Sequence, residues 1–371
     1  MTIFPKNKLI SEDIIMAYTL VDLSRNADLP VYIFERMLLL RERIISTIER
    51  RTETIHKLGL DEKFCIGDSN WISDGSADFF HASKYVQAGD YKIINTLRFW
   101  SQCFTGYKIM RLQDGAGTHS VEPVPEPYDK WLSDNRSSPD NWCHHWHSLM
   151  SYRPKHIFSP PRMLGEIGWD VEGVVVSHDT CAYQERLSLM EEGGVFARLA
   201  KLGRPPQILE IGGGYGALAR AIHAHYPQSR YVICDLPESL VFSGLYLTAT
   251  TGLIPDVYNG EDEFSPSSSF SLLPNYLFDL CDQSAVQFDL VINTLSMSEM
   301  SEHQVRRYAR GIKHLIGKEG IFYEQNQDNT VVGMIYAKDY IKDILNYRKN
   351  IASPFPVVHG LADLWSNMPL N

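Results

Sequence analysis

The sequence predicts an α/β fold in which a doubly wound parallel sheet follows a mainly helical amino-terminal part. Three observations support this prediction. Short apolar segments alternate with helical segments from about residue 207 onward, a glycine-rich turn follows the first of them, and the first 100 residues carry apolar side chains at helical spacing. We place the boundary after residue 150, which gives a helical domain over 1–150 and an α/β domain over 151–371.

The amino-terminal part contains two candidate helical regions. The first runs from Val31 to Lys57 and has apolar residues at helical spacing, namely Phe34, Met37, Leu38, Leu40, Ile44, Ile45 and Ile48. The second runs from Ala77 to about Phe104 and has many aromatic residues on a wide apolar face. We expect these rings to pack between helices, with a lid lined by rings over a substrate pocket as the alternative.

Two segments with many turn-forming residues separate these helices from the sheet. Residues 121–140 are rich in Pro and Ser with interleaved charges, so they are expected to be a connection. Residues 154–179 are also expected to be mostly loop. Helices are then predicted over 182–202, with an interruption at Gly193 and Gly194 just before the first strand.

The sheet elements follow in a regular order. Strands are predicted at about 207–211, 230–234, 270–273, 288–293 and 320–325, and the first two flank a helix over 215–225. Pro237 suits the first turn of the next helix. Ser301 and Gln304 form a capping box, so a helix is expected to begin just after Ser301. Residues 328–371 must supply the last strands of the sheet.

The glycine turn after the first strand carries the strongest chemical signal. Glu210 closes the strand, and Gly212, Gly214 and Gly216 follow at alternate positions, while Asp235 ends the second strand. Glycine lets a backbone approach a nucleotide closely, and a carboxylate at the end of the second strand can bind ribose hydroxyls. The spacing Gly212-x-Gly214-x-x-Ala217 also fits a dinucleotide site, but Glu210 and Gly216 favour S-adenosylmethionine.

Composition narrows the class of protein. The apolar runs are far shorter than the ~20 residues of a membrane span, and the first residues do not form a signal peptide, so we expect a cytoplasmic protein without membrane partners. The six cysteines form no CxxC pair, which argues against a zinc ribbon or a disulfide framework. The formal charge of −10 disfavours nucleic acid as a partner and suits a small neutral or cationic acceptor.

Further motifs make a family resemblance specific. The segments that carry it are 177–186, 210–216, 234–238, 288–300 and 323–326. Together they resemble the sugar O-methyltransferases of antibiotic and surface-polysaccharide pathways, within the class I S-adenosylmethionine-dependent methyltransferases. The resemblance implies a Rossmann-like methyltransferase domain, S-adenosylmethionine as the cofactor and a sugar hydroxyl, on a nucleotide sugar or a glycoside, as the acceptor. The alternatives are O-methylation of a non-sugar natural product and an NAD(P)-dependent oxidoreductase.

A sugar hydroxyl is a poor nucleophile at neutral pH, so methyl transfer to it calls for a general base. His178 and Asp179 are the first candidates, because they lie in a segment expected to pass over the cofactor. Glu299 follows the fourth strand, at the sheet edge where ligands bind in open α/β folds. Glu324 ends the fifth strand and is the last candidate.

Side chains around the glycine turn are expected to bind the cofactor. Glu210 is expected to orient the turn or meet the methionine amine, and Asn275 is expected to bind adenine after the third strand. The methionine part is expected to contact Asn293 and Thr294 at the end of the fourth strand and a pair ahead of the first strand, Tyr183 and Gln184. The cofactor-binding set is therefore Tyr183, Gln184, Glu210, Gly212, Gly214, Gly216, Asp235, Asn275 and Asn293.

The sequence does not favour a metal. No acidic pair follows the fourth strand, which argues against a magnesium-bridged diol site, although a divalent metal is possible. Cys143-His144-His145-Trp146-His147 is the one transition-metal candidate, and packing of a tryptophan-rich segment is the favoured explanation for it. A homo-oligomer is compatible with the sequence, and the helical domain is a possible site of contact between copies.

Overall fold

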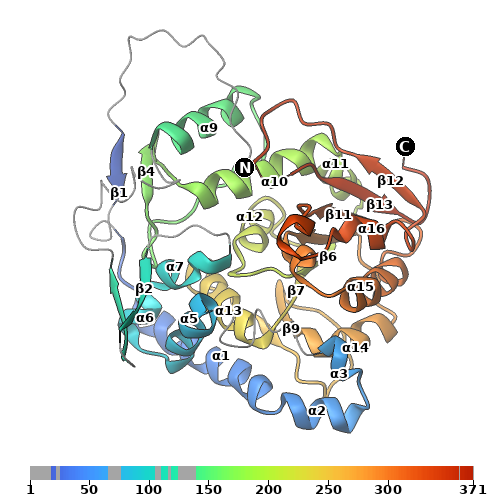
Figure 1. The fold of residues 1–371 in the computed structure, drawn as a ribbon, viewed down its shortest axis with the longest axis horizontal. Helices are drawn as coiled ribbons and strands as arrows, with labels where there is room; N and C mark the ends of the chain where they lie inside the picture. Colours follow the sequence, from blue (N-terminus) through green and yellow to red (C-terminus); the bar gives the residue numbers. More distant parts are fainter. Residues whose placement is uncertain are drawn as a thin grey trace.

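An eight-stranded, mainly parallel sheet forms the centre of the protein (Figure 1). The computed structural model describes residues 18–21, 26–65, 77–104, 110–115, 118–123, 139–358 and 360–370. The strands follow the order β12-β13-β11-β10-β6-β7-β9-β8. Their bounds are β6 Gln207–Ile211, β7 Arg230–Asp235, β8 Asp256–Val257, β9 Phe270–Pro274, β10 Leu290–Thr294, β11 Ile321–Gln325, β12 Tyr347–Asn350 and β13 Asp363–Ser366.

The strand order has a switch point at β6. The chain passes from β6 to β7 and β9 on one side, then crosses back to β10 and β11 on the other, so β6 lies between β7 and β10. Strand β13 is antiparallel to both of its neighbours, β11 and β12. The predicted doubly wound α/β fold is confirmed, and the first strand has the predicted bounds.

Alternate residues of each central strand face opposite sides of the sheet, and both sides are buried. Ile208 and Ile233 belong to one apolar cluster, whereas Leu209 and Val232 belong to the other. Strands buried on both faces are almost continuously apolar, as residues 231–234 are and as residues 208–211 are apart from Glu210. The fold therefore has three layers, with the sheet between two layers of helices.

Helices of the carboxyl-terminal part cover both faces of the sheet. One face packs against α10 (His178–Glu192), α11 (Val195–Leu199), α12 (Ala217–His225) and α13 (Pro237–Thr251). The other face packs against α14 (Phe278–Gln283), α15 (Glu302–Leu315) and α16 (Ala337–Ile341). Pro237 begins α13, and both bonds of the Ser301–Gln304 capping box are present, so these two local predictions are confirmed.

The amino-terminal part is mainly helical, as predicted, but its helices are shorter than predicted. The region 31–57 divides at Arg50 into α1 and α2, and the region 77–104 divides into four short helices. The bounds are α1 Val31–Glu49, α2 Arg51–Leu58, α3 Glu62–Cys65, α5 Ala77–Ala88, α6 Tyr91–Asn95, α7 Leu97–Trp100, the 3-10 helix η3 Ser101–Phe104 and α9 Pro139–Ser151. The break between α5 and α6 occurs where Asp90 caps α6 by accepting from the backbone N–H groups of Lys92 and Ile93.

Two segments expected to be loops contain strands. The hairpin of β2 (Met110–Gly115) and β3 (Thr118–Pro123) overlaps the start of the predicted connection at 121–140. A small antiparallel sheet of β1 (Thr19–Val21), β4 (Gly168–Val171) and β5 (Val174–Val176) lies where 154–179 was expected to be mostly loop. Strands β2 and β3 form a local hairpin, as do β4 and β5, whereas β1 pairs with β4 from a distant part of the chain. Pairing between distant segments leaves little signal in the local sequence.

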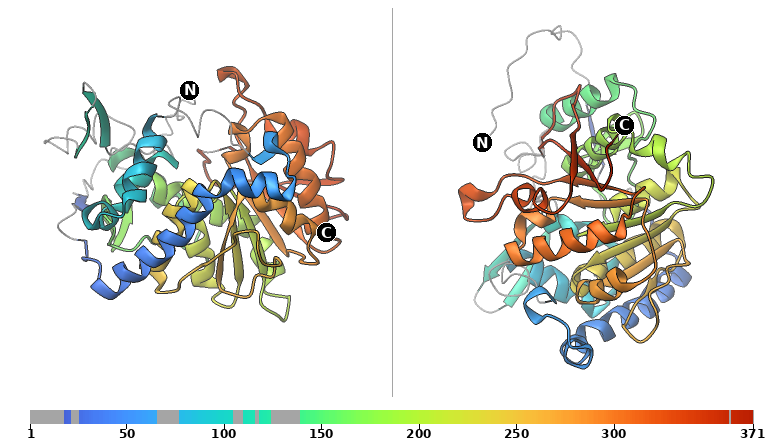
Figure 2. Two further views of the ribbon diagram at one scale, coloured as in Figure 1. Left: turned by 90° about the horizontal axis from the view of Figure 1, so that it is seen from below. Right: turned by 90° about the vertical axis from the view of Figure 1, so that its right-hand side faces the viewer.

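The amino-terminal helices pack directly on the α/β part. Helix α1 lies against α13, and the helices α1 and α5 occupy one side of the sheet while α15 occupies the other (Figure 2, left). One cluster of buried apolar residues contains Leu40 and Ile44 of α1 together with Leu245 of α13. The division into two domains at residue 150 stays a prediction, and this shared core joins its two sides.

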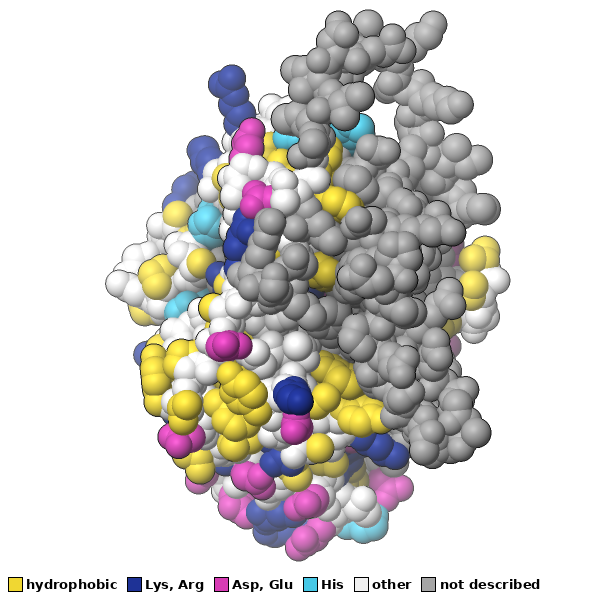
Figure 3. Space-filling model, turned by 90° about the vertical axis from the view of Figure 1, so that its left-hand side faces the viewer, with side chains coloured by type: hydrophobic (Ala, Val, Ile, Leu, Met, Phe, Trp, Pro, Cys, Tyr) yellow, Lys and Arg dark blue, Asp and Glu magenta, His cyan; other side chains and the backbone are white. Residues whose placement is uncertain are grey.

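The described surface is mixed in charge. On the face drawn in Figure 3, hydrophobic side chains gather in several clusters between acidic and basic ones. Within the described ranges, the structure contains no helix with both the length and the apolar character needed to cross a membrane.

A buried ion network joins the amino-terminal helices to α10. Arg98 of α7 is 2% exposed, and its Nε donates to Glu166 Oε2 at 2.8 Å while its Nη2 donates to Asp179 Oδ2 at 2.7 Å. The guanidinium also lies 3.9 Å from the ring centroid of Tyr215, which follows the glycine turn. Arg98 therefore ties together α7, the segment before β4, the start of α10 and the turn after β6.

We predict that Arg98→Met destabilises the protein by about 3 kcal/mol at neutral pH, because it leaves two carboxylates buried without their cation. Chemical denaturation at pH 7.5 measures the loss. The loss should shrink at pH 5, because burial raises the pKa of Glu166 and a protonated carboxyl does not need the guanidinium. Arg306→Met, which removes a surface cation bonded to Glu302, is the control and should change the midpoint little. Equal losses for the two variants would contradict the prediction.

Candidate active site

An open cavity of about 310 Å³ lies at the carboxyl ends of the central strands. This is the crevice beside the switch point where open α/β folds bind their ligands. Its lining comes from η3, α10, the turn after β6, the ends of β7 and β10, and the start of α15. The residues are Phe104, Tyr183, Arg186, Glu210, Ile211, Gly212, Gly213, Gly214, Cys234, Asp235, Leu236, Ser239, Asn275, Thr294, Leu295, Ser296, Glu299, Met300, Gln304 and Tyr308.

The glycine turn forms the floor of the cavity because nothing larger fits. Gly212 has φ +75°, and a Cβ atom there would lie 2.0 Å from Ser296 Oγ. At Gly214 a Cβ would lie 3.2 Å from the Phe104 ring. Gly216 does not line the cavity; it is the residue that precedes α12. Two of the three predicted glycines thus bring the backbone to the cavity, and the third begins a helix.

Asp235 is fixed at the end of β7 with its carboxylate in the cavity. Its Oδ2 accepts from the Gly214 backbone N–H at 2.9 Å, and its Oδ1 accepts from that of Leu236 at 2.7 Å. Burial raises the pKa of Asp235 to about 6. A carboxylate held in this way is suited to accept from a pair of ribose hydroxyls.

Asn275 follows β9, next to the end of β7, and provides a hydrogen-bond acceptor to the cavity. Its Nδ2 donates to the Cys65 carbonyl at 2.9 Å, which fixes the direction of the amide. Its Oδ1 is buried and has no hydrogen-bond partner. Buried acceptors are rarely left unbonded, so this oxygen suits the exocyclic amine of adenine.

Glu210 lies in the floor of the cavity. The Tyr231 hydroxyl donates to its Oε2 at 3.0 Å, and burial raises the pKa of the carboxyl to about 7. A cationic group bound in the cavity would stabilise the ionised form. This geometry fits the expected contact with a methionine amine.

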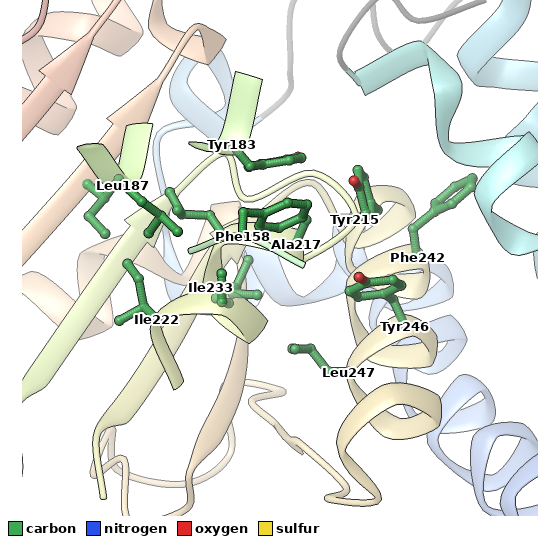
Figure 4. Packing of buried hydrophobic residues seen from close by; sticks show 14 of the residues in the cluster. Phe158, Tyr183, Leu187, Tyr215, Ala217, Ile222, Ile233, Phe242, Tyr246 and Leu247 are labelled. Atoms are coloured by element: carbon green, nitrogen blue, oxygen red, sulfur yellow. The ribbon is translucent and has the colours of Figure 1, made fainter. Parts of the chain in front are cut away.

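Helix α10 crosses above the glycine turn and brings Tyr183 to the cavity. The Ser177 hydroxyl caps the helix, and the Tyr183 ring stacks on Phe158 at 5.0 Å and meets Tyr215 edge-on at 5.7 Å. In Figure 4, Tyr183, Tyr215 and Tyr246 lie among the other side chains of this buried apolar cluster. One turn further along α10, Arg186 also lines the cavity. Sequence reasoning missed Arg186, although its i+3 spacing from Tyr183 was a usable signal.

Two predicted cofactor ligands support the site without lining it. Gln184 is buried; its Oε1 accepts from the Phe158 N–H at 2.8 Å, and its Nε2 donates to the His156 carbonyl and to Ser188. Asn293 is fully buried, and its Nδ2 donates to the Ile211 carbonyl at 2.8 Å. We correct both assignments, because these amides are used in holding loops together. Thr294, the next residue after Asn293, lines the cavity instead.

Glu299 is the candidate base that lines the cavity. It ends the 3-10 helix η5 (Ser296–Glu299), which follows β10 directly. The capping box at Ser301 begins α15 only after this turn, as predicted, so Glu299 belongs to the cavity rim rather than to a helix face.

Glu324 lies outside the cavity, and we correct its assignment as a base. Its side chain is fully buried, with Asn326 Nδ2 donating to Oε1 at 2.7 Å and Lys338 Nζ lying 3.6 Å from Oε2. Burial raises the pKa of the carboxyl to about 7. Glu324 belongs to an ion network between β11, β13 and α16, in which Lys338 also pairs with Asp363 at 2.8 Å.

His178 and Asp179 adjoin the site but do not line the cavity. The Asp179 carboxylate is held in the buried pair with Arg98, so we correct its assignment as a base. His178 Nδ1 lies 3.2 Å from Asp179 Oδ1, and the imidazole packs edge-on against Trp142 at 4.7 Å. This contact orients the imidazole beside the network.

The transition-metal candidate is part of a packed helix. Residues 143–147 belong to α9, where Trp142 and Trp146 are buried. His145 Nε2 lies 2.6 Å from Glu185 Oε1, so this histidine has a carboxylate partner. Throughout the described residues, no group of three or more His, Cys, Asp or Glu side chains is arranged to hold a metal ion.

We predict that Glu210→Gln stabilises the ligand-free protein by about 2 to 3 kcal/mol at pH 8 and by little at pH 5. Because the folded-state pKa of about 7 lies above the ordinary value of 4.5, the folded protein binds the extra proton between these pH values. The wild type therefore loses stability as pH rises through this range, and the neutral amide does not. Urea denaturation at both pH values measures the difference.

Glu319→Gln is the control, since Glu319 is exposed and its replacement should bring no gain at pH 8. A Glu210→Gln gain of the same size at pH 5 and pH 8 would refute the assignment of the effect to ionisation.

Residues 182–293 match the O-methyltransferase domain family. Among solved structures, human methyltransferase-like protein 13 bound to S-adenosylhomocysteine matches with 18% identity over 48% of this chain and 82% of its own, at a TM-score of 0.34. A candidate O-methyltransferase from Nostoc punctiforme matches with 11% identity over 79% of this chain and 95% of its own, at a TM-score of 0.33.

CalS10, an amino pentose methyltransferase from Micromonospora echinaspora, matches with 13% identity over 43% of this chain and 55% of its own, at a TM-score of 0.27. No curated protein sequence matches the chain. The matched domain begins on α10 and ends in β10, so it contains the glycine turn, Asp235 and Asn275. With this domain and this cavity, the chain is an S-adenosylmethionine-dependent O-methyltransferase of Rossmann-like fold.

Proposed function

We propose that the protein methylates a hydroxyl of a sugar, carried on a nucleotide or a glycoside, in natural-product or surface-polysaccharide biosynthesis. One observation carries the proposal: Glu299 lines the cavity among side chains that can hydrogen-bond a polyhydroxylated acceptor. These side chains are the hydroxyl-bearing Thr294 and Ser296. The motifs that resemble sugar O-methyltransferases support the same acceptor class.

The cofactor would bind along the edge formed by the ends of β6, β7 and β9. Asp235 would accept from the ribose hydroxyls, and the unbonded Oδ1 of Asn275 would accept from the adenine amine. The glycine turn leaves room for the ligand between these groups and the loop after β10. When bound, S-adenosylmethionine supplies an electrophilic methyl group next to a positively charged sulfur.

The acceptor hydroxyl must then meet that methyl group in line with the breaking bond. The bound cofactor would supply the methyl group and keep the electron pair of the carbon–sulfur bond, so the residues of this chain have to hold the hydroxyl and take its proton. Glu299 would take the hydroxyl proton, which keeps the attacking oxygen from becoming a cation. Alignment in a closed site contributes several kcal/mol to such a displacement.

The amino-terminal region would help to close the acceptor side of the cavity. Phe104 of η3 supports this role, because it is a cavity-lining residue from that region. Arg98 would hold η3 in place, since it bonds to Ser101 at the start of η3 and to Asp179 on α10.

The second candidate acceptor is the hydroxyl of a non-sugar natural product. The apolar side chains of Phe104, Leu236 and Met300 in the cavity lining favour it, since a ring system could pack against them. The polar set beside Glu299 favours the sugar.

We expect labelled methyl groups to transfer to sugars and not to phenols. The assay incubates the protein with labelled S-adenosylmethionine and free sugars, nucleotide sugars, glycosides, phenolic compounds and polyketides, each with and without chelator. Transfer should persist with chelator, because the proposed step uses a carboxylate in place of a metal. Label found only in phenolic or polyketide products would reject the sugar proposal.

We predict that Glu299→Gln lowers kcat roughly 100-fold or more, because the amide cannot take the hydroxyl proton. The Kd for S-adenosylhomocysteine should change less than about twofold. The matched control is Glu302→Gln, since Glu302 lies on the next turn, is exposed and is bonded to Arg306. Unchanged kcat in Glu299→Gln, measured with the best acceptor of the panel, would remove Glu299 from the mechanism.

A further inference from the structure

Arg186 is a buried cation in the cavity wall, and the proposed methyl transfer does not use it. It lies on α10, is 3% exposed and lines the cavity. Its guanidinium packs 4.7 Å from the ring centroid of Tyr183. Its Nε is buried without a hydrogen-bond partner, and within the described ranges the side chain forms no ion pair.

Burying a guanidinium in this way is costly. A charge removed from water costs several kcal/mol unless a partner of opposite sign compensates it. Arg98, which is equally buried, has two carboxylates and a serine hydroxyl as partners. The difference between the two arginines indicates that the partner of Arg186 is an anion that enters the cavity.

Glu210 faces the same space from β6. Its carboxyl interacts electrostatically with Arg186, but the two side chains do not form an ion pair. Arg186 and Glu210 thus present a cation and a carboxylate to the cavity from different elements, while Asp235 and Glu299 are the other carboxylates of its lining. A ligand with a carboxylate and an ammonium close together, which is an α-amino acid, complements this arrangement.

The residues at the two ends of the cavity indicate which half of the cofactor binds at each end. Asp235 and Asn275 lie at the ends of β7 and β9, on the side suited to ribose and adenine. Glu210 ends β6 and Arg186 belongs to α10, so both lie on the side left for the methionine half.

We propose that Arg186 binds the α-carboxylate of S-adenosylmethionine while Glu210 binds its α-ammonium group. The Tyr183 ring holds the guanidinium in place, because it packs against Arg186 on the same helix. Arg186 is then a specificity residue, since it selects the complete cofactor over forms that lack the carboxylate. The inference rests on the binding of S-adenosylmethionine and is independent of the acceptor.

Isothermal titration with three ligands tests the proposal. S-adenosylhomocysteine carries both charged groups, S-adenosyl-3-thiopropylamine lacks the carboxylate, and 5′-methylthioadenosine lacks both. Arg186→Gln should weaken S-adenosylhomocysteine roughly 10- to 100-fold and leave the other two within about twofold. Glu210→Gln should weaken the two ligands that have an ammonium group and leave 5′-methylthioadenosine within about twofold.

Arg230→Gln is the matched control, because Arg230 is exposed at the far end of β7 from Asp235 and should affect none of the ligands. Equal weakening of all three ligands by Arg186→Gln would assign Arg186 a structural role and overturn the proposal. If Arg186→Gln does not fold, the affinities of the wild type decide. Binding of S-adenosylhomocysteine less than about twofold tighter than that of S-adenosyl-3-thiopropylamine would also overturn the proposal. Failure of the wild type to bind S-adenosylhomocysteine at all would instead refute the cofactor itself.

Discussion

The rest of the site depends on how closely the glycine turn approaches the loop after β10. Ser296 occupies the space that a side chain at position 212 would need. Asn293 then donates to both the Ile211 carbonyl, at 2.8 Å, and Ser296 Oγ, at 2.6 Å, so the ends of β6 and β10 are joined by a buried amide. This contact sets the floor of the cavity and the position of the turn that carries Glu299.

The protein uses two buried arginines in opposite ways. Arg98 has its carboxylate partners within the chain, and it holds four segments together beside the glycine turn. Arg186 has no such partner among the described residues, and its charge faces the cavity. A satisfied ion network gives rigidity, whereas a buried charge without a partner is costly and is stabilised when an ion of opposite charge binds beside it. The rigid network lies directly behind the proposed ligand site.

The amino-terminal helices contribute to the site through packing as well as chemistry. Their apolar residues share one core with α13, and Phe104 approaches Gly214 closely. The Cys65 carbonyl accepts from Asn275, so this segment also aims the adenine-side amide. The methyltransferase domain of this chain therefore depends on the preceding helices for the walls of its cavity.

Local patterns in the sequence determined the α/β class, the strand β6, the start of α13 at Pro237 and the capping box at Ser301. They also predicted that Glu210, Gly212 and Asp235 lie at the cavity. These are decided by neighbours along the chain, through apolar periodicity, backbone conformation and hydrogen bonds within one turn. The tertiary structure alone decided that Asn293 and Gln184 hold loops, that Asp179 and Glu324 belong to ion networks, and that Arg186 faces the cavity. The first four of these roles depend on a partner many residues away, such as Arg98 for Asp179 or Lys338 for Glu324. Residue type and local spacing do not specify which distant partner the fold supplies.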